Sequence, residues 1–103
     1  MFVNHVQTTK REARHFLETL NDFFASHDAD AIPAGYTMLS EVVLPMERLI
    51  QWRVRETENR RAVLINNSTG EKWMLMVSYQ KDGGDLTFHQ IDALYKLKKN
   101  RFF

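Results

Sequence analysis

The residues best suited to metal binding or acid–base chemistry lie in one short acidic stretch. His27, Asp28 and Asp30 place an imidazole and two carboxylates within four residues. These ligand types suit zinc or manganese, but a site also needs a third or fourth ligand at matching geometry. The sequence offers no HExxH pattern, no second His four residues on and no calcium-loop spacing. We therefore expect a polar loop here and no metal site.

Nucleophiles and phosphate-binding loops give no stronger signal. The chain has no Cys, and none of its serines lies in a GxSxG turn. Gly83 and Gly84 form the one glycine pair, without the surrounding pattern that cradles phosphate. We therefore expect a protein that is not an enzyme, with no catalytic residues and no cofactor.

Two groups of basic residues are candidates for binding nucleic acid. One group surrounds the first predicted hairpin and the other lies near the C-terminus; their members are Arg53, Arg55, Arg60, Arg61, Lys96, Lys98, Lys99 and Arg101. RNA or single-stranded DNA requires such cations together with exposed aromatic rings. Strand alternation, however, turns Trp52 and Trp73 away from the arginines and toward the expected core. Nucleic-acid binding is therefore the alternative hypothesis.

The leading candidate for a binding surface is a face of methionine, arginine and aliphatic residues. If Trp73 and its alternate neighbours point inward, Met74 and Met76 point outward. The predicted partner-binding set is Arg53, Arg55, Val63, Ile65, Met74 and Met76, although Ala62 and Leu64 could take the place of Val63 and Ile65. Methionine and arginine are enriched at protein interfaces. Residues 36–44 could instead fold over this face and hide it.

Apolar residues at helical spacing predict a helix at each end of the chain. Thr9 and Glu12 fit a capping box at the start of a helix over residues 10–26. Thr87 and Gln90 fit a second capping box before a helix over residues 88–99.

Between these helices the apolar period changes to two, which indicates strands. Strands are predicted over 49–55, 61–65 and 72–79, with polar turns at 57–60, 66–71 and 81–85. Residues 36–44 are ambiguous, because Val42 and Val43 favour a strand while Ser40 and Glu41 could open a helix. The fold expected is α+β: an antiparallel meander of three to four strands with N-terminal and C-terminal helices packed on one face, a two-layer sandwich.

Composition predicts a single domain over residues 1–103. The chain is 44% hydrophobic and 12% aromatic, which supplies a core and excludes a disordered chain. A formal net charge of +1 provides no global field toward nucleic acid or membrane. With no Cys, no signal-peptide pattern and no long apolar run, we expect a cytoplasmic protein without a membrane partner.

These observations lead to a functional expectation. We expect a small non-enzymatic protein-binding module that acts as an inhibitor, an adaptor or a subunit of a complex. Its size alone suggests a short accessory gene, including those of phages and mobile elements. Open sheet edges and the terminal pair Phe102 and Phe103 also predict a homodimer.

Overall fold

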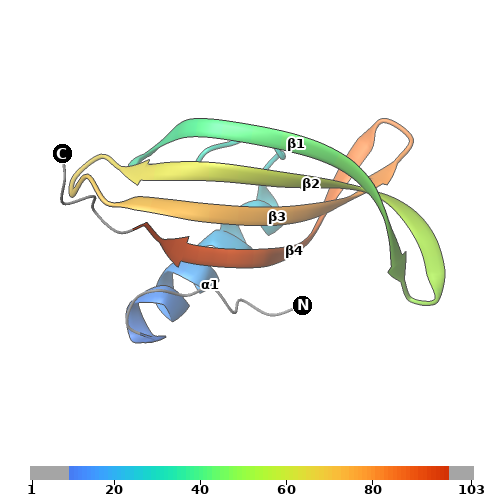
Figure 1. The fold of residues 1–103 in the computed structure, drawn as a ribbon, viewed down its shortest axis with the longest axis horizontal. Helices are drawn as coiled ribbons and strands as arrows, with labels where there is room; N and C mark the ends of the chain where they lie inside the picture. The colour runs from blue at the N-terminus through green and yellow to red at the C-terminus, as the bar shows by residue number, and fades with distance from the viewer. Residues whose placement is uncertain (1–9, 98–103) are drawn as a thin grey trace.

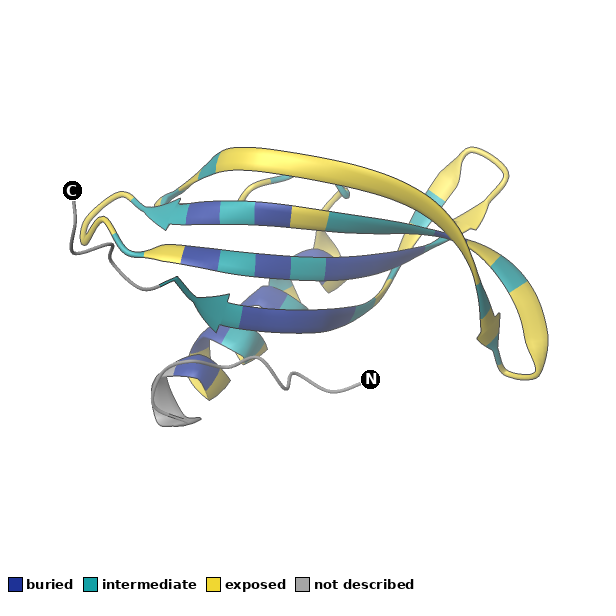
Figure 2. Cartoon of the chain, viewed as in Figure 1, coloured by how far each residue is buried: buried dark blue, intermediate teal, exposed yellow. Residues whose placement is uncertain are grey.

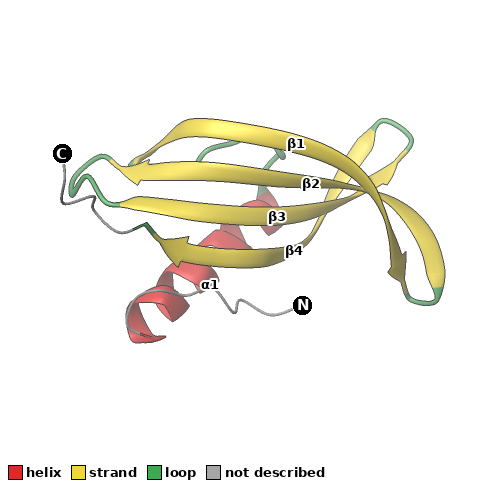
Figure 3. Cartoon of the chain, in the orientation of Figure 1, coloured by secondary structure: helices red, strands yellow, loops and turns green. Residues whose placement is uncertain are grey.

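The computed structural model of the protein describes residues 10–97, with side chains from residue 13 onward. One helix precedes four strands: α1 (Lys10–Ser26), β1 (Tyr36–Ile50), β2 (Arg53–Asn66), β3 (Lys72–Asp82) and β4 (Asp85–Lys96). The strands form one antiparallel sheet in the order β1-β2-β3-β4. The helix crosses one face of this sheet, so the described chain is an α+β arrangement of two layers (Figures 1 and 3).

The N-terminal helix predicted over residues 10–26 is present as α1, and its apolar stripe faces the sheet. Ala13, Phe16, Leu20 and Phe24 are buried, with the spacing of three and four residues that lines one side of a helix. They pack on the inner face of the sheet, whose core side chains are Leu64, Trp73, Leu75, Val77, Tyr79, Ile91 and Leu94. The Phe16 ring lies 4.9 Å from the Trp73 ring in an edge-on contact. This layer buries the central strands (Figure 2).

The C-terminal helix predicted over residues 88–99 is wrong, because residues 85–96 form strand β4. Phe88, Ile91 and Leu94 recur every three residues, which imitates one face of a helix. In the sheet they pair with Tyr79, Val77 and Leu75, which recur every two residues. The pairing skips His89 and Asp92, so β4 carries an extra residue at each of two bulges. Two bulges therefore convert the strand period into an apparent helical period.

The first hairpin also lies elsewhere than predicted. The turn falls at Gln51 and Trp52, inside the predicted strand 49–55, and β2 runs straight through the predicted turn at 57–60. Trp52 is 91% exposed, so its expected place in the core is wrong. Ile50, Trp52 and Val54 alternate with polar residues, but Ile50 lies in β1, Trp52 in the turn and Val54 in β2, so they do not share one face of a strand.

The ambiguous segment 36–44 is a strand. It belongs to β1 and pairs with β2 along the edge of the sheet, so it does not fold over the outer face. The predicted turns near 66–71 and 81–85 are confirmed, with Gly70 and Gly83 at positive φ values of 77° and 65°. The one described helix is too short and too polar to cross a membrane.

Candidate functional site

The distal part of the β1–β2 hairpin projects beyond the rest of the sheet. Strand β3 pairs with β2 only from Thr57 onward, so residues 47–56 form a two-stranded ribbon with no third strand beside it. We call residues 47–56 the arm. Figure 1 shows the arm curving away from the end of the sheet at which β3 turns into β4. An isolated two-stranded ribbon is only marginally stable in water, so the arm needs contacts with the sheet to keep its place.

The tip of the arm is apolar and has an unusual backbone. Gln51 and Trp52 both have positive φ, at 51° and 64°. Two-residue hairpin turns with this backbone favour Asn-Gly, because side chains with a Cβ are strained there. Trp52 is 91% exposed, and the neighbouring Leu49 and Val54 are 65% and 68% exposed. Three large apolar side chains therefore gather in water at the end of a projecting element.

A polar cluster on the outer face holds the base of the arm. Arg48 donates two hydrogen bonds to the Asp92 carboxylate, at 3.0 and 3.3 Å. Asp92 also accepts hydrogen bonds from the Ser78 hydroxyl and, at 2.6 Å, from the Gln90 amide. Arg48 lies on β1 and Asp92 on β4, the two opposite edges of the sheet. The contact is therefore possible only because the sheet coils and brings the base of the arm, at Arg48, over the outer face, while residues 36–44 stay at the sheet edge.

This polar cluster has a structural role and does not form a reactive site. Ser78 is fully buried, and its hydroxyl lies within hydrogen-bond distance of both Asp92 and Asn59, at 3.2 Å from Asn59 Oδ1. A buried hydroxyl with these partners has no path to a substrate. The Asp92 side chain is 7% exposed, and its oxygens are occupied by Arg48, Ser78 and Gln90. The cluster fixes the arm relative to the sheet.

A second charged cluster lies on the inner face, beyond the end of α1. Arg60 pairs with Glu58 at 2.7 Å and with Asp30 at 2.8 Å. Its guanidinium lies 5.5 Å from the centre of the Tyr79 ring, a cation–π distance. Burial raises the pKa of Tyr79 to about 12; the nearby Arg60 opposes this shift, and the carboxylates around it add to it. Arg60 is thus held inside the fold.

The acidic stretch considered as a metal site does not form one cluster, because its side chains contact different parts of the protein. Asp30 pairs with Arg60, and His27 stacks on the Phe23 ring at 4.1 Å between centroids. The Nδ1 atom of His27 also lies 2.9 Å from the carbonyl oxygen of Phe23. Within residues 10–97 the structure contains no group of three or more His, Cys, Asp or Glu side chains placed to hold a metal ion.

The predicted partner-binding residues fall into two separate groups. Val63 lies opposite Met74, and Ile65 and Met76 are close to them on the same outer face. All four are half-buried, while Ala62 and Leu64 face the helix and are fully buried. Arg53 and Arg55 lie in the arm instead, and eight residues of strand, roughly 26 Å, separate Arg55 from Val63.

The basic residues proposed for nucleic-acid binding are also dispersed. Arg60 is bound by carboxylates, and Arg61 is exposed opposite Met76. Lys96 pairs with Glu71 at the end of the sheet opposite the arm, and this bond lowers the pKa of Glu71. Lys98, Lys99 and Arg101, like Phe102 and Phe103, lie outside the described residues.

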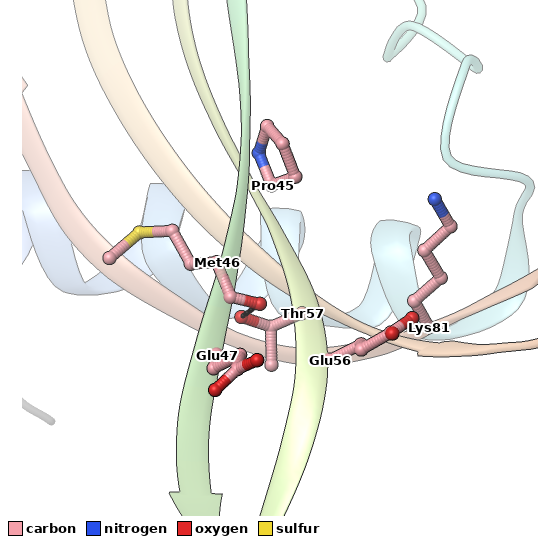
Figure 4. Close-up of a pocket in the computed structure, with 6 residues that line it drawn as sticks. All are labelled: Pro45, Met46, Glu47, Glu56, Thr57 and Lys81. Atoms are coloured by element: carbon pink, nitrogen blue, oxygen red, sulfur yellow. Dashed lines mark hydrogen bonds between the residues drawn. The ribbon is translucent and has the colours of Figure 1, made fainter.

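A hollow of about 530 Å³ lies where the arm leaves the sheet (Figure 4). Its lining residues are Pro45, Met46, Glu47, Glu56, Thr57 and Lys81. In Figure 4 the side chains of Glu47 and Lys81 point away from each other, and the Thr57 hydroxyl donates to the Met46 carbonyl at 3.3 Å. Polar groups that do not converge on one point give this hollow no specific small-molecule chemistry.

Comparison with known proteins adds no relative. The chain matches no protein-family model, no curated protein and no solved structure. The function must therefore be inferred from the surfaces of the protein. The sequence did not predict the turn at the arm tip, because Gln51-Trp52 contains none of the Asn, Gly or Pro residues that mark a turn.

The first prediction concerns the polar cluster. Asp92→Ala leaves Arg48 and Gln90 without their shared acceptor, so we expect a loss of about 2–3 kcal/mol in the free energy of unfolding, measured by urea denaturation. Amide exchange at residues 47–50 should also accelerate, because the arm loses its attachment. Asp85→Ala, at an exposed position of the same strand, should change stability by less than about 0.5 kcal/mol. Equal stability of the two variants would show that the cluster does not hold the arm.

The second prediction concerns the backbone at the tip. Trp52→Gly removes the strain of a Cβ at positive φ, whereas Trp52→Ala removes the same indole and retains that strain. We expect the glycine variant to be more stable than the alanine variant by about 0.5–1 kcal/mol, after the entropy cost of glycine is subtracted. Urea denaturation of both variants measures the difference. A glycine variant less stable than the alanine variant would contradict a left-handed Trp52.

Proposed function

We propose that this protein is a non-enzymatic protein-binding module, acting as an inhibitor, an adaptor or a subunit of a complex, and that the arm tip is its docking element. The observation that carries the proposal is the 91% exposure of Trp52 in the turn of the arm, next to the exposed pair Leu49 and Val54. Tryptophan is the residue type most enriched among those that dominate binding energy at protein interfaces.

The position of the tip supports this role. An indole in water forgoes the stabilisation of burial, and Trp52 additionally has the strained backbone described above. Residues with strained backbone conformations cluster at functional sites. The Arg48–Asp92 contact holds the base of the arm, so the tip is preorganised, which lowers the entropy cost of docking.

The chemistry of the tip defines the partner. Trp52, Leu49 and Val54 fit an apolar cleft, and the exposed Arg53 at the margin favours an acidic rim around that cleft. The half-buried patch around Val63 and Met74 is a second contact area, farther from the tip. Because a chain without Cys needs no oxidising compartment, we also propose that this binding takes place in the cytoplasm.

Affinity capture with matched variants tests the proposal. The wild-type protein and Ile32→Ala, which truncates an exposed apolar residue outside the arm, should retain the same partner protein, and Trp52→Ala should lose it. Calorimetry with the purified partner should then show roughly 30-fold weaker binding for Trp52→Ala, the loss typical of a hot-spot residue. Equal binding by all three proteins would reject the arm tip as the docking element.

A second candidate function is binding of single-stranded nucleic acid, which the exposure of Trp52 beside Arg53 favours. The test is an electrophoretic shift of labelled RNA and DNA at two salt concentrations. If phosphates are bound, the logarithm of the association constant should fall linearly with the logarithm of the salt concentration, with a slope of about −0.7 for each phosphate contact. Trp52→Ala should weaken the shift, since it removes the stacking ring. The absence of a shift at low salt would exclude this function.

A further inference from the structure

The edge of the sheet formed by β1 is exposed and apolar on both of its faces. Only β2 pairs with β1 in the described part of the chain, so the other side of this fifteen-residue strand is open. Figure 2 shows β1 exposed along most of its length. The large exposed side chains of its middle section are Leu39, Val42, Val43, Leu44 and Met46, each close to half exposed.

This edge carries its protective features only at the borders of its central section. Protected edges carry lysines, inward-pointing charges, bulges or prolines, and the section from Val42 to Leu44 contains none of these. Of the three charged residues of β1, Arg48 is bound to Asp92, Glu41 lies 3.8 Å from Arg60, and Glu47 is exposed at the base of the arm. A bulge near Leu39 and the single Pro45 bound an open stretch of regular strand between them. The opposite edge strand, β4, differs because its large apolar residues Ile91 and Leu94 are buried in the core.

We propose that a second copy of this chain pairs with β1, antiparallel about a two-fold axis at Val43, and joins the two sheets into one of eight strands. In this register Val43 of one chain faces Val43 of the other. On either side of the axis, Val42 of one chain faces Leu44 of the other. Residues on the same face of the sheet meet, because antiparallel partners have the same strand parity. The centre of the interface is therefore three consecutive aliphatic pairs.

Charge and apolar pairing together favour this register and a second copy as the partner. With the axis at Val43, Glu41 faces Pro45 and Glu47 faces Leu39, so no two like charges are opposite each other. Moving the axis to Leu44 places Glu41 opposite Glu47, and moving it to Glu41 places two glutamates face to face. An axis at Val42 avoids like charges too, but it places Glu41 opposite Val43 and loses two of the three aliphatic pairs. A strand that matches its own reversed copy gives the self-complementary contact of a closed dimer. This surface is distinct from the arm tip, so the dimer carries two free tips.

Sedimentation and cysteine cross-linking test the dimer on the full chain. The wild-type protein should sediment at about twice its mass of 12.2 kDa at high micromolar concentration. Because the sequence contains no Cys, Val43→Cys introduces a single thiol at the axis. It should form a disulfide-linked dimer in air. Leu49→Cys places its thiol roughly 40 Å from its copy in this register, and it should remain largely uncrosslinked.

A charge substitution provides the complementary result. Val43→Glu places two carboxylates face to face at the axis, while in the isolated chain position 43 is 44% exposed and leaves the new carboxylate in contact with water. We expect a folded monomer, with at least tenfold weaker dimerisation than the wild type. Val54→Glu adds the same charge on the arm and should leave the dimer intact. A monomeric wild type, or a dimer that persists in Val43→Glu without cross-linking in Val43→Cys, would overturn the proposal. Trp52→Ala should remain a dimer, which separates this result from the arm-tip proposal.

Discussion

The Asp92 carboxylate is the point on which the shape of this protein depends. Asp92 is the extra residue of a bulge in β4, and it lies at one edge of the sheet. Its bond to Arg48 at the opposite edge requires the sheet to coil until the base of the arm approaches the outer face. A flat sheet would hold these residues several strand widths apart. One ionic contact, supported by Ser78 and Gln90, thus fixes the coil of the sheet and the direction of the arm.

The distribution of apolar side chains follows from this arrangement. One helix can cover only part of one face of four strands, and α1 buries its stripe mainly against β3, β4 and the adjoining part of β2. Strand β1 and the arm extend beyond this cover, and their apolar residues remain in water. The protein consequently divides into a packed half, which supplies stability, and an extended half with surfaces suited to other molecules.

The candidate binding residues were only partly predictable. Val63 and Met74 could be placed on one outer face because strand alternation fixes which side each residue occupies. Arg53 and Arg55 could not be separated from that patch, since the hairpin turn near them has no sequence signal. Trp52 was assigned to the core for the same reason, because a displaced turn reverses the assignment of every side chain around it. The exposed edge of β1 became visible only with the strand order.

The sequence by itself determined the N-terminal helix, the strand over residues 72–79, which the structure extends to Asp82, and the two glycine-containing turns. In these elements the local signal is complete, because the apolar period or the turn residue lies within a few positions of the sequence. Only the tertiary structure decided that residues 85–96 form a strand. There the spacing of Phe88, Ile91 and Leu94 equals a helical period, and the bulges that produce it are defined by pairing with β3. The tertiary structure likewise decided the exposure of Trp52, because a turn with positive φ at two residues other than glycine is imposed by the pairing of β1 with β2 over their whole length.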